Sequence, residues 1–489
     1  MLEAQNSPKE KRYRTVAILI IMLGVTMSAI DTTAVVLGLP VMKQDLNTDI
    51  LSMIWVLLAY LLIITILGTQ VGKLGDMFGR VRMYNLGFAL FTFGSLLCGL
   101  SQDGTQLIAF RVLQGVGGAF ISSNSGAIIA DTFQQRERGK AFGITGMGWS
   151  IGAVLGILVG GFFVTFLTWR YIFFINIPIG IFATIAGYYL LQERSPRKRQ
   201  AIDLGGIVLM GTSLLLILVA ITDITGSGWK TEYDLELVVG IVALLGFILW
   251  ERYASNPFLD FSLFRDRIFR SSSLAAFFQA LASYAVIFLV IMYLQGPRGM
   301  TPWDASLLLI PGYVLGGLIA PFSGRLSDYR GARVIASIGL LLQICGILVY
   351  STLALDTSVL VVVLGSVLSG AGTSTFFPAN TSAVMANAPP HSYGISAGLL
   401  RTMSNLGMVC SFAVAIFFAS IAIPRDLAFQ IFLGVGEGIS GPLASAFIDG
   451  MRSALLVSIL LLLVAFVLSI LRGKEKRAMG REEEVEGHP

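Results

Sequence analysis

Long apolar stretches alternate with short polar segments along nearly the whole chain. Each apolar stretch is close to the 20 or so residues with which an α-helix crosses the hydrocarbon core of a bilayer. The pattern predicts fourteen membrane-spanning helices and thus an all-α polytopic membrane protein. Their expected ranges are 16–39, 50–71, 83–100, 106–129, 141–166, 171–191, 204–221, 235–250, 271–294, 305–323, 334–353, 359–384, 395–421 and 451–471.

Composition supports this class. Of the 489 residues 55% are hydrophobic and 13% are charged, and the mean hydropathy is +0.79. Soluble domains carry roughly 25% charged residues, so a soluble protein is excluded. The first fourteen residues are polar and basic, and the apolar run after them has full spanning length, so no cleavable signal peptide is expected.

The distribution of Lys and Arg predicts the orientation. With the N-terminus in the cytoplasm, the inner segments hold 26 of the 34 Lys and Arg residues, and the outer loops hold six. Cytoplasmic loops of membrane proteins are enriched in these residues. One miscounted helix would invert every later loop and remove the bias. An even number of helices and two cytoplasmic termini are therefore expected.

A short basic motif occurs twice. Residues 72–82 and residues 324–333 both approximate Gly-x-Leu-x-Asp-x-x-Gly-x-x-Arg, 252 positions apart, and each follows an apolar helix. The repeat predicts two related six-helix halves, as in many secondary transporters. The expected parts are an N-terminal bundle (1–191), a connector with two extra helices (192–270), a C-terminal bundle (271–472) and a disordered cytoplasmic tail (473–489).

Several classes of enzyme and pump are disfavoured. The chain has no Gly-x-x-x-x-Gly-Lys-Ser/Thr phosphate-binding loop, so direct ATP-driven transport is not expected. It also lacks His, Cys and carboxylate residues at metal-ligand spacing, and no Ser-His pairing lies within the spans. We expect no cofactor and no metal, and a proton gradient as the energy source.

Four stretches carry a family resemblance. The motif at 72–82 is similar to the signature loop of the major facilitator superfamily, and 107–115, with Arg111, is similar to its helix-four arginine motif. Residues 30–40 and 169–180 resemble motifs of its fourteen-span drug:proton antiporters. The resemblance implies a 6 + 2 + 6 arrangement of helices, proton-coupled efflux and alternating access.

The chain departs from that family at three places. The helix-five motif reads Gly156-Ile157 where Gly-Pro is usual, and Val36 stands where Asn is frequent. The Asn-x-x-Arg order of helix thirteen is replaced by Arg401-Thr-Met-Ser404. These differences bear on substrate and coupling and not on the fold.

Asp31 is the one acidic residue deep within an apolar run. A central Asp costs about 2.5–3.5 kcal/mol on insertion scales, so such residues usually face a water-filled pathway. Burial favours the protonated carboxyl, which makes Asp31 a candidate proton carrier. The alternative is a structural Asp that caps or kinks the first helix.

Arg111 is the expected partner of Asp31, because both lie roughly 9–14 Å below the outer surface at a rise of about 1.5 Å per residue. Protonation of Asp31 would then release Arg111 for other contacts. Alternatively, Arg111 holds backbone carbonyl groups between helices.

The two copies of the motif are interpreted as conformational latches at the cytoplasmic side. This interpretation rests mainly on the family resemblance. Acidic and basic side chains there can pair with neighbouring helix ends, and the glycines permit tight turns and close backbone approach. Retention of topology by positive charge is the alternative. The residues expected to act as the latch are Gly72, Asp76, Gly79, Arg80, Arg82, Asp328 and Arg330.

Other candidates concern packing and the substrate. Gly148, Gly152, Gly156 and Gly160 repeat every four residues, a spacing that lets membrane helices approach closely. Trp149 lies mid-helix and lines a substrate cavity or simply packs. Arg401 is a pathway residue or reaches the inner headgroups. The candidate substrate-cavity residues are Trp149, Gln114, Arg401 and Asn405.

Together these features predict a proton-coupled exporter of small amphipathic or hydrophobic, often cationic, compounds in the cell membrane. It would act as a monomer on a small-molecule substrate and protons within the lipid bilayer. The alternatives are an exporter of a specific metabolite, peptide-like or lipid-like compound, or an uncoupled uniporter or sensor of the same fold.

Overall fold

The computed structural model describes residues 7–133, 135–194, 197, 201–227, 230–254, 261–387, 393–421 and 441–473. Within these ranges the chain forms α-helices and one short 3₁₀ helix, and no strand. The expected tail after 473 lies outside the described residues, as does most of the outer segment 422–449.

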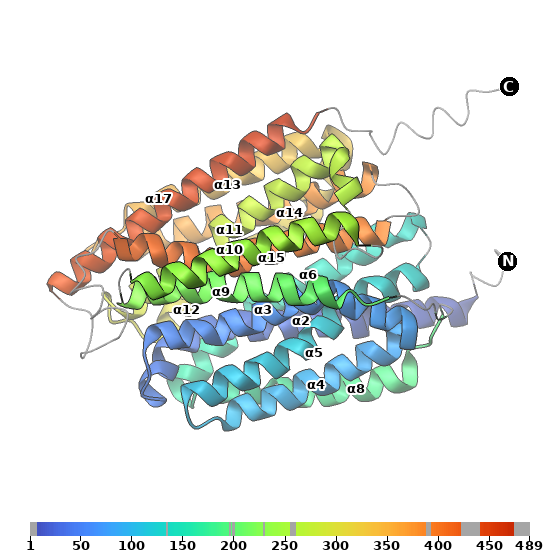
Figure 1. Cartoon of the computed structure of the whole chain (residues 1–489), viewed down its shortest axis with the longest axis horizontal. Helices are drawn as coiled ribbons and strands as arrows, with labels where there is room; N and C mark the ends of the chain where they lie inside the picture. Colours follow the sequence, from blue (N-terminus) through green and yellow to red (C-terminus); the bar gives the residue numbers. More distant parts are fainter. Residues whose placement is uncertain are drawn as a thin grey trace. The chain divides into compact units, whose positions relative to one another are not determined.

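Every predicted apolar stretch is helical (Figure 1). The helices of the first half are α2 (Pro8–Asp45), α3 (Ile50–Phe78), α4 (Arg80–Leu100), α5 (Gly104–Thr132), α6 (Gln135–Phe166), α7 (Tyr171–Phe174) and α8 (Asn176–Leu190). Then follow α9 (Leu204–Ser227), α10 (Thr231–Tyr253), η1 (Phe261–Arg265), α11 (Arg267–Gln295), α12 (Pro302–Arg330), α13 (Ala332–Ser351), α14 (Val359–Asn387), α15 (Tyr393–Ile421) and α17 (Pro442–Leu471).

Most helices extend beyond the predicted apolar ranges because polar residues cap them outside the apolar run. Ser7, Asp49, Asp103 and Asp266 each accept a hydrogen bond from a backbone N–H of the first helical turn. The last helix was expected to begin at Met451 but begins at Pro442, a residue that is favoured in the first turn because it needs no N–H partner there.

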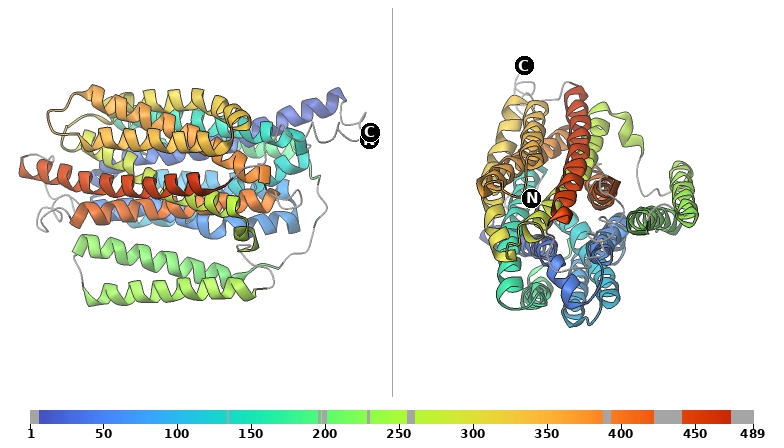
Figure 2. Two further views of the ribbon diagram at one scale, coloured as in Figure 1. Left: turned by 90° about the horizontal axis from the view of Figure 1, so that it is seen from above. Right: turned by 90° about the vertical axis from the view of Figure 1, so that its left-hand side faces the viewer.

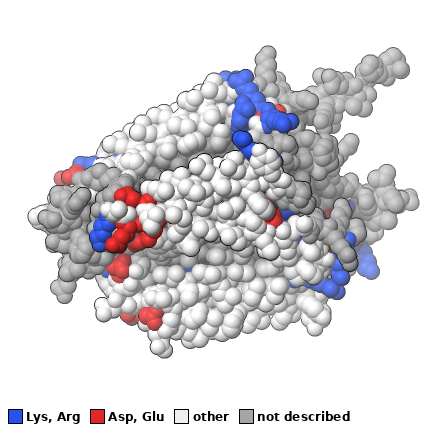
Figure 3. Space-filling view, viewed as in Figure 1, with Lys and Arg blue, Asp and Glu red and all other residues white. Residues whose placement is uncertain are grey.

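Thirteen helical segments of the described residues are long and apolar enough to cross a membrane, with α7 and α8 taken together as Tyr171–Leu190. The remaining long helix, α5, has 29 residues but is less apolar, because it carries Arg111, Gln106, Gln114 and Asn124. On the face shown in Figure 3, charged side chains gather near helix ends, and the middle of the helices is almost free of them.

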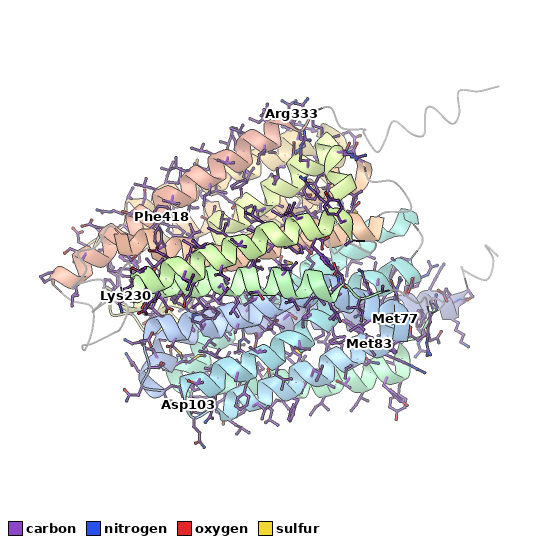
Figure 4. All side chains as sticks on the ribbon, viewed as in Figure 1. Met77, Met83, Asp103, Lys230, Arg333 and Phe418 are labelled. Atoms are coloured by element: carbon purple, nitrogen blue, oxygen red, sulfur yellow. The ribbon has the colours of Figure 1, made fainter. Side chains whose placement is uncertain are left out.

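The basic motif is less of a turn than its glycines suggested. Helix α3 continues through Gly72 and Gly75 to Phe78, so these two glycines make no turn. Gly75 instead permits close approach, the other expected use of these glycines, because Asn124 lies against it. Only Gly79 reverses the chain, with φ +113°, a conformation that disfavours side chains. Gly331 repeats this geometry in the second copy, with φ +93°. Figure 4 places Met77 and Met83 on either side of the first turn.

The chain divides into two compact units, Met1–Gly211 with Leu249–Phe258, and Thr212–Ile248 with Leu259–Pro489. In the first unit α2 packs on α6, α5 packs on both α3 and α4, and α8 packs on α4 and α2. In the second unit α11 packs on α15, α14 packs on both α12 and α13, and α17 packs on α13 and α11. The two units therefore share one pairing scheme.

Glycines mark the same close contacts in both units. Gly87 and Gly94 of α4 lie against the backbone of α5. Gly339 and Gly346 of α13, again 252 positions later, lie against the backbone of α14. The repeat first seen in the basic motif thus continues through the following helix.

Helices α9 and α10 lie side by side in both views of Figure 2. The first unit includes the beginning of α9 and the end of α10. There Asp203 caps α9 by accepting the N–H of Gly206 (2.8 Å), and it also accepts the indole N–H of Trp250 (2.9 Å). The backbone N–H of Asp203 donates to Gln70 Oε1 of α3 (3.2 Å). Asp203 thus joins these two helix ends to α3.

The four-residue glycine ladder of α6 lies along α2. A Cβ atom at Gly152 would lie 2.6 Å from the Thr26 carbonyl oxygen and 2.7 Å from Ala29 Cβ. Gly148 lies against Met22 and Thr26, Gly156 against Ile30 and Thr33, and Gly160 against Ala34. The hydroxyl of Thr26 donates across the contact to the Gly148 carbonyl (3.0 Å). The missing side chains therefore let the two backbones meet.

We predict that Gly152→Ala lowers the free energy of unfolding by about 1–3 kcal/mol, because the added methyl group overpacks a backbone contact. Gly146→Ala on the same helix is the matched control. No atom lies within 4 Å of a Cβ built there, so the helix propensity of Ala should leave stability unchanged or raise it by up to about 1 kcal/mol. Thermal unfolding of the purified variants in detergent measures both. An equal loss of unfolding free energy in Gly152→Ala and Gly146→Ala would contradict the close α2–α6 contact.

Candidate functional site

A buried ion pair lies inside the first unit. Arg111 Nη1 of α5 donates to Asp31 Oδ2 of α2 at 2.6 Å, and both side chains are fully buried, with 0% exposure. The structure therefore brings together the two charges that the sequence placed at similar depth. Since the two helices are far apart in the chain, tertiary packing alone creates the pair.

Two amide side chains complete the surroundings of the Asp31 carboxylate. Gln114 Nε2 donates to Asp31 Oδ1 (2.8 Å), and Asn176 Nδ2 donates to the same oxygen (3.2 Å). Both amides also donate to Ser95 Oγ of α4, at 2.6 and 3.0 Å. The carboxylate thus accepts hydrogen bonds from three side chains on two helices.

The guanidinium of Arg111 is held by further groups. Its Nε donates to the carbonyl oxygen of Val56 on α3 (2.9 Å), and its Nη1 also donates to Gln114 Oε1 (2.6 Å). The Tyr60 ring lies 4.2 Å from the guanidinium carbon, close enough for a cation–π contact. The alternative interpretation of Arg111, as a residue that holds a carbonyl group between helices, thus describes one of its contacts.

Local sequence explains these placements. Arg111 and Gln114 are three residues apart, so they project from the same face of α5. Asn176 opens α8, directly after the break between α7 and α8. Pro178 accounts for the break, because it has no N–H to donate to the carbonyl of Phe174. The span expected at 171–191 is present as Tyr171–Leu190, interrupted at Ile175, and Asn176 directly after the interruption lies beside Asp31.

The two charged groups of this arrangement differ in their chemistry. A lone charge at this depth is costly, whereas a charge that is paired and hydrogen-bonded is tolerated. Asp31 can lose its charge by binding a proton, but Arg111 cannot lose its own. Protonation would therefore leave Arg111 charged and in need of another partner. Its Nη2 is buried and has no hydrogen-bond partner among the described residues.

The motif residues lie in a second cluster of the first unit. Arg80 bonds to Asp76 (2.7 Å) and to Asp131 at the end of α5 (2.6 Å), so it connects α3, α4 and α5. The side chain of Arg82 is exposed, and its backbone N–H donates to Glu193 Oε1 (2.9 Å). Glu193 also lies against Gly79, where a Cβ atom would collide with its carboxylate.

The remaining candidates are less clearly placed at a site. Trp149 and Asn405 are partly buried, and Arg330 and Arg401 are exposed. The side chain of Asp328 lies outside the described part of the structure. Of the four candidate cavity residues, only Gln114 is brought into the Asp31–Arg111 cluster.

Sequence reasoning did not assign Ser95, Asn176 or Asp131 to a site. Asn176 was noted only within a family motif, although a polar residue just before a helical proline was a usable signal. Ser95 carried no signal, because serines are frequent in this chain's apolar runs. Asp131 lies at the polar end of its helix, where acidic residues are common.

Comparisons with known proteins give the family context. A sequence profile of the Major Facilitator Superfamily matches residues 21–411. The chain is 31% identical to the riboflavin transporter RibZ of Clostridioides difficile over 86% of this chain and 90% of that protein. It is 30% identical to the tetracenomycin C resistance and export protein of Streptomyces glaucescens over 80% and 73% of the two chains. It is also 30% identical to the multidrug transporter protein MdtP of Bacillus subtilis, over 81% of this chain and 73% of that protein.

Solved structures show the same fold. A bacterial homologue of the human lysosomal transporter Spinster superposes with a TM-score of 0.66 at 20% identity, covering 94% of this chain and 97% of that one. The human organic anion transporter MFSD10 superposes with a TM-score of 0.62 at 15% identity, covering 95% of this chain and 100% of that one.

We predict strong coupling between Asp31 and Arg111 in a double-mutant cycle. Asp31→Asn leaves the arginine charge buried and unpaired, which should cost about 3–5 kcal/mol. Arg111→Gln should cost less, because Asp31 can neutralise itself by binding a proton. The double variant should lose less than the sum of the two. The measurement is thermal unfolding of the purified variants in detergent.

The pair Asp45–Arg170 is the matched control. Its charges are also 2.6 Å apart, but the side chains are 47% and 31% exposed, so its coupling should stay below about 1 kcal/mol. Similar coupling in both pairs would mean that burial does not strengthen the Asp31–Arg111 interaction.

Proposed function

The chain belongs to the Major Facilitator Superfamily, and we propose that it is a proton-coupled exporter of small amphipathic or hydrophobic, often cationic, compounds. Membership of the family makes it a multi-pass transporter of the cell membrane and not an enzyme. The observation that carries this proposal is the buried Asp31–Arg111 pair. A titratable group within a membrane span is costly unless it serves a pathway or a proton relay.

We also propose the finer topology. Fourteen spans arranged as six, two and six would place both termini in the cytoplasm, as the distribution of Lys and Arg suggests. The shared pairing scheme of α2–α8 and α11–α17 supports two six-helix bundles. The protein would act as a monomer, because both bundles lie in one chain.

Coupling would follow from the chemistry of Asp31. In one phase the ionised carboxylate is paired with Arg111, and in the other a proton neutralises it. A cationic substrate competes with the proton for the same negative charge, so the two cannot be bound together. The proton's movement supplies about 2.3 kcal/mol per 100 mV of membrane potential, and about 1.4 kcal/mol per unit of pH difference.

The cluster around Arg80 fits the role of a cytoplasmic latch within this cycle. It connects the ends of three helices of the first unit through exchangeable ion pairs. Loss of those pairs would favour the conformation in which the cytoplasmic side opens.

A second candidate function is export of one metabolite. Relatives include multidrug and tetracenomycin exporters, but also a riboflavin transporter of comparable identity. That similarity supports a neutral, ring-containing metabolite as an alternative substrate. Proton coupling through Asp31 is expected for either substrate.

The experiment is transport into proteoliposomes with an acidic interior. With the membrane potential clamped, wild-type protein should accumulate tetraphenylphosphonium, a permanent cation that is not trapped by pH. Asp31→Asn should only equilibrate the cation, so its accumulation should fall at least about tenfold, since it can no longer exchange a proton for substrate. Riboflavin is tested in the same vesicles.

Asp45→Asn and protein-free liposomes are the controls, because Asp45 is exposed and paired outside the buried cluster. Accumulation of riboflavin alone would favour the metabolite exporter. Equilibration by the wild type regardless of the pH gradient would refute proton coupling and favour a uniporter.

A further inference from the structure

Asn176 and Gln114 contact the same oxygen of Asp31 but are anchored differently. Both amides donate to Asp31 Oδ1 and to Ser95 Oγ. The difference lies in what each carbonyl oxygen does. This difference decides which of the two amides can respond when Asp31 gains a proton.

The amide of Gln114 is fixed in one orientation. Its Oε1 accepts hydrogen bonds from Arg111 Nη1 (2.6 Å) and from Cys98 Sγ (3.7 Å). Reversing the amide would point its NH₂ group at the guanidinium, so two donors would face each other. Gln114 therefore remains a donor to Asp31 in both protonation states.

The amide of Asn176 is anchored only through its nitrogen. Asn176 Oδ1 is buried and accepts no hydrogen bond from the residues that the structure describes, and the side chain is fully buried. The observed orientation, with NH₂ toward Asp31, is the one that an ionised carboxylate prefers. A protonated carboxyl instead offers an O–H, which needs an acceptor.

We propose that Asn176 is a positioning residue whose amide reverses when Asp31 binds a proton. In the reversed orientation Oδ1 accepts the new Asp31 O–H and the Ser95 O–H, and Nδ2 gives up its two present hydrogen bonds and takes the place that Oδ1 occupies now. Ser95 changes from acceptor to donor toward Asn176 and still accepts from Gln114. The proton comes from the transport pathway and returns to it, and no covalent bond other than the carboxyl O–H changes.

The reversal connects protonation to the backbone. Asn176 is the first residue of α8 and follows the one-residue interruption at Ile175 after α7. Among the described residues, the charged and titratable groups that interact with Asp31 are Arg111 of α5 and Cys98 of α4, and Tyr60 of α3 lies beside Arg111. Where α6 faces α2 near Asp31, the described contacts are those of the glycine ladder. Asn176 is thus the one neutral contact of Asp31 that can serve both protonation states.

This inference rests on the proposal that Asp31 carries the coupling proton. The first test uses wild-type protein with ¹³C-labelled asparagine, in infrared difference spectra between high and low pH. As Asp31 becomes protonated, one asparagine carbonyl band should shift to lower frequency, because that carbonyl gains hydrogen bonds. The shift should be absent in Asn176→Val. A carboxyl band that titrates without any asparagine shift would refute the reversal.

The second test compares the pH profiles of proton-driven uptake of tetraphenylphosphonium by Asn176→Thr and Asn176→Val, which have nearly the same shape. A hydroxyl can donate or accept a hydrogen bond, so Asn176→Thr should keep most of the uptake rate. The uptake rate of Asn176→Val should fall about tenfold, and the midpoint of its pH profile should stay within about half a pH unit of the wild-type midpoint. An upward midpoint shift of about one pH unit in Asn176→Val would identify a fixed donor and overturn the proposal. Absence of any titrating carboxyl in wild type would instead refute the role of Asp31.

Discussion

The first unit depends on how a carboxylate can be kept in an apolar interior. Asp31 is tolerated there because Arg111 neutralises it and two amides donate to it. Arg111 and Gln114 are on α5, which packs on α3 and α4. Asn176 is on α8, which begins directly after the interruption that follows α7. The ion pair therefore has direct contacts on four helices, α2, α3, α5 and α8. Under the proposed role of Asp31, one proton would change a contact that all four share.

Close helix contacts make such a change transmissible. The glycine ladder of α6 lets α2 approach it backbone to backbone, and Gly87 and Gly94 do the same for α4 and α5. Interfaces of this kind have few side chains to rearrange, so two helices can slide or rock as rigid bodies. The Arg80 cluster connects the ends of α3, α4 and α5 by ion pairs. The buried Asp31–Arg111 cluster also has contacts on these three helices, through Val56, Ser95 and Arg111.

Much of this could be predicted from the sequence. Apolar runs of spanning length gave the helices, and the repeated motif indicated two similar halves. Asp31 and Arg111 stood out because charges within such runs are rare. The amides could not be assigned, since a Gln or Asn in a membrane helix looks the same whether it lines a cavity or binds a charge. The sequence could not tell which glycines of the motif make a turn and which permit close packing: Gly79 makes the turn, and Gly75 packs against Asn124. The start of α17 depended on Pro442, outside the most apolar window.

The most direct test of the account is to count both fluxes in one vesicle population. A pH-sensitive dye trapped inside proteoliposomes reports proton movement while a cation-selective electrode follows tetraphenylphosphonium outside. The account predicts a fixed ratio of protons to cations for the wild type, and cation movement without proton movement for Asp31→Asn. Proton movement that persists at the same ratio in Asp31→Asn would contradict the claim that Asp31 carries the coupling proton.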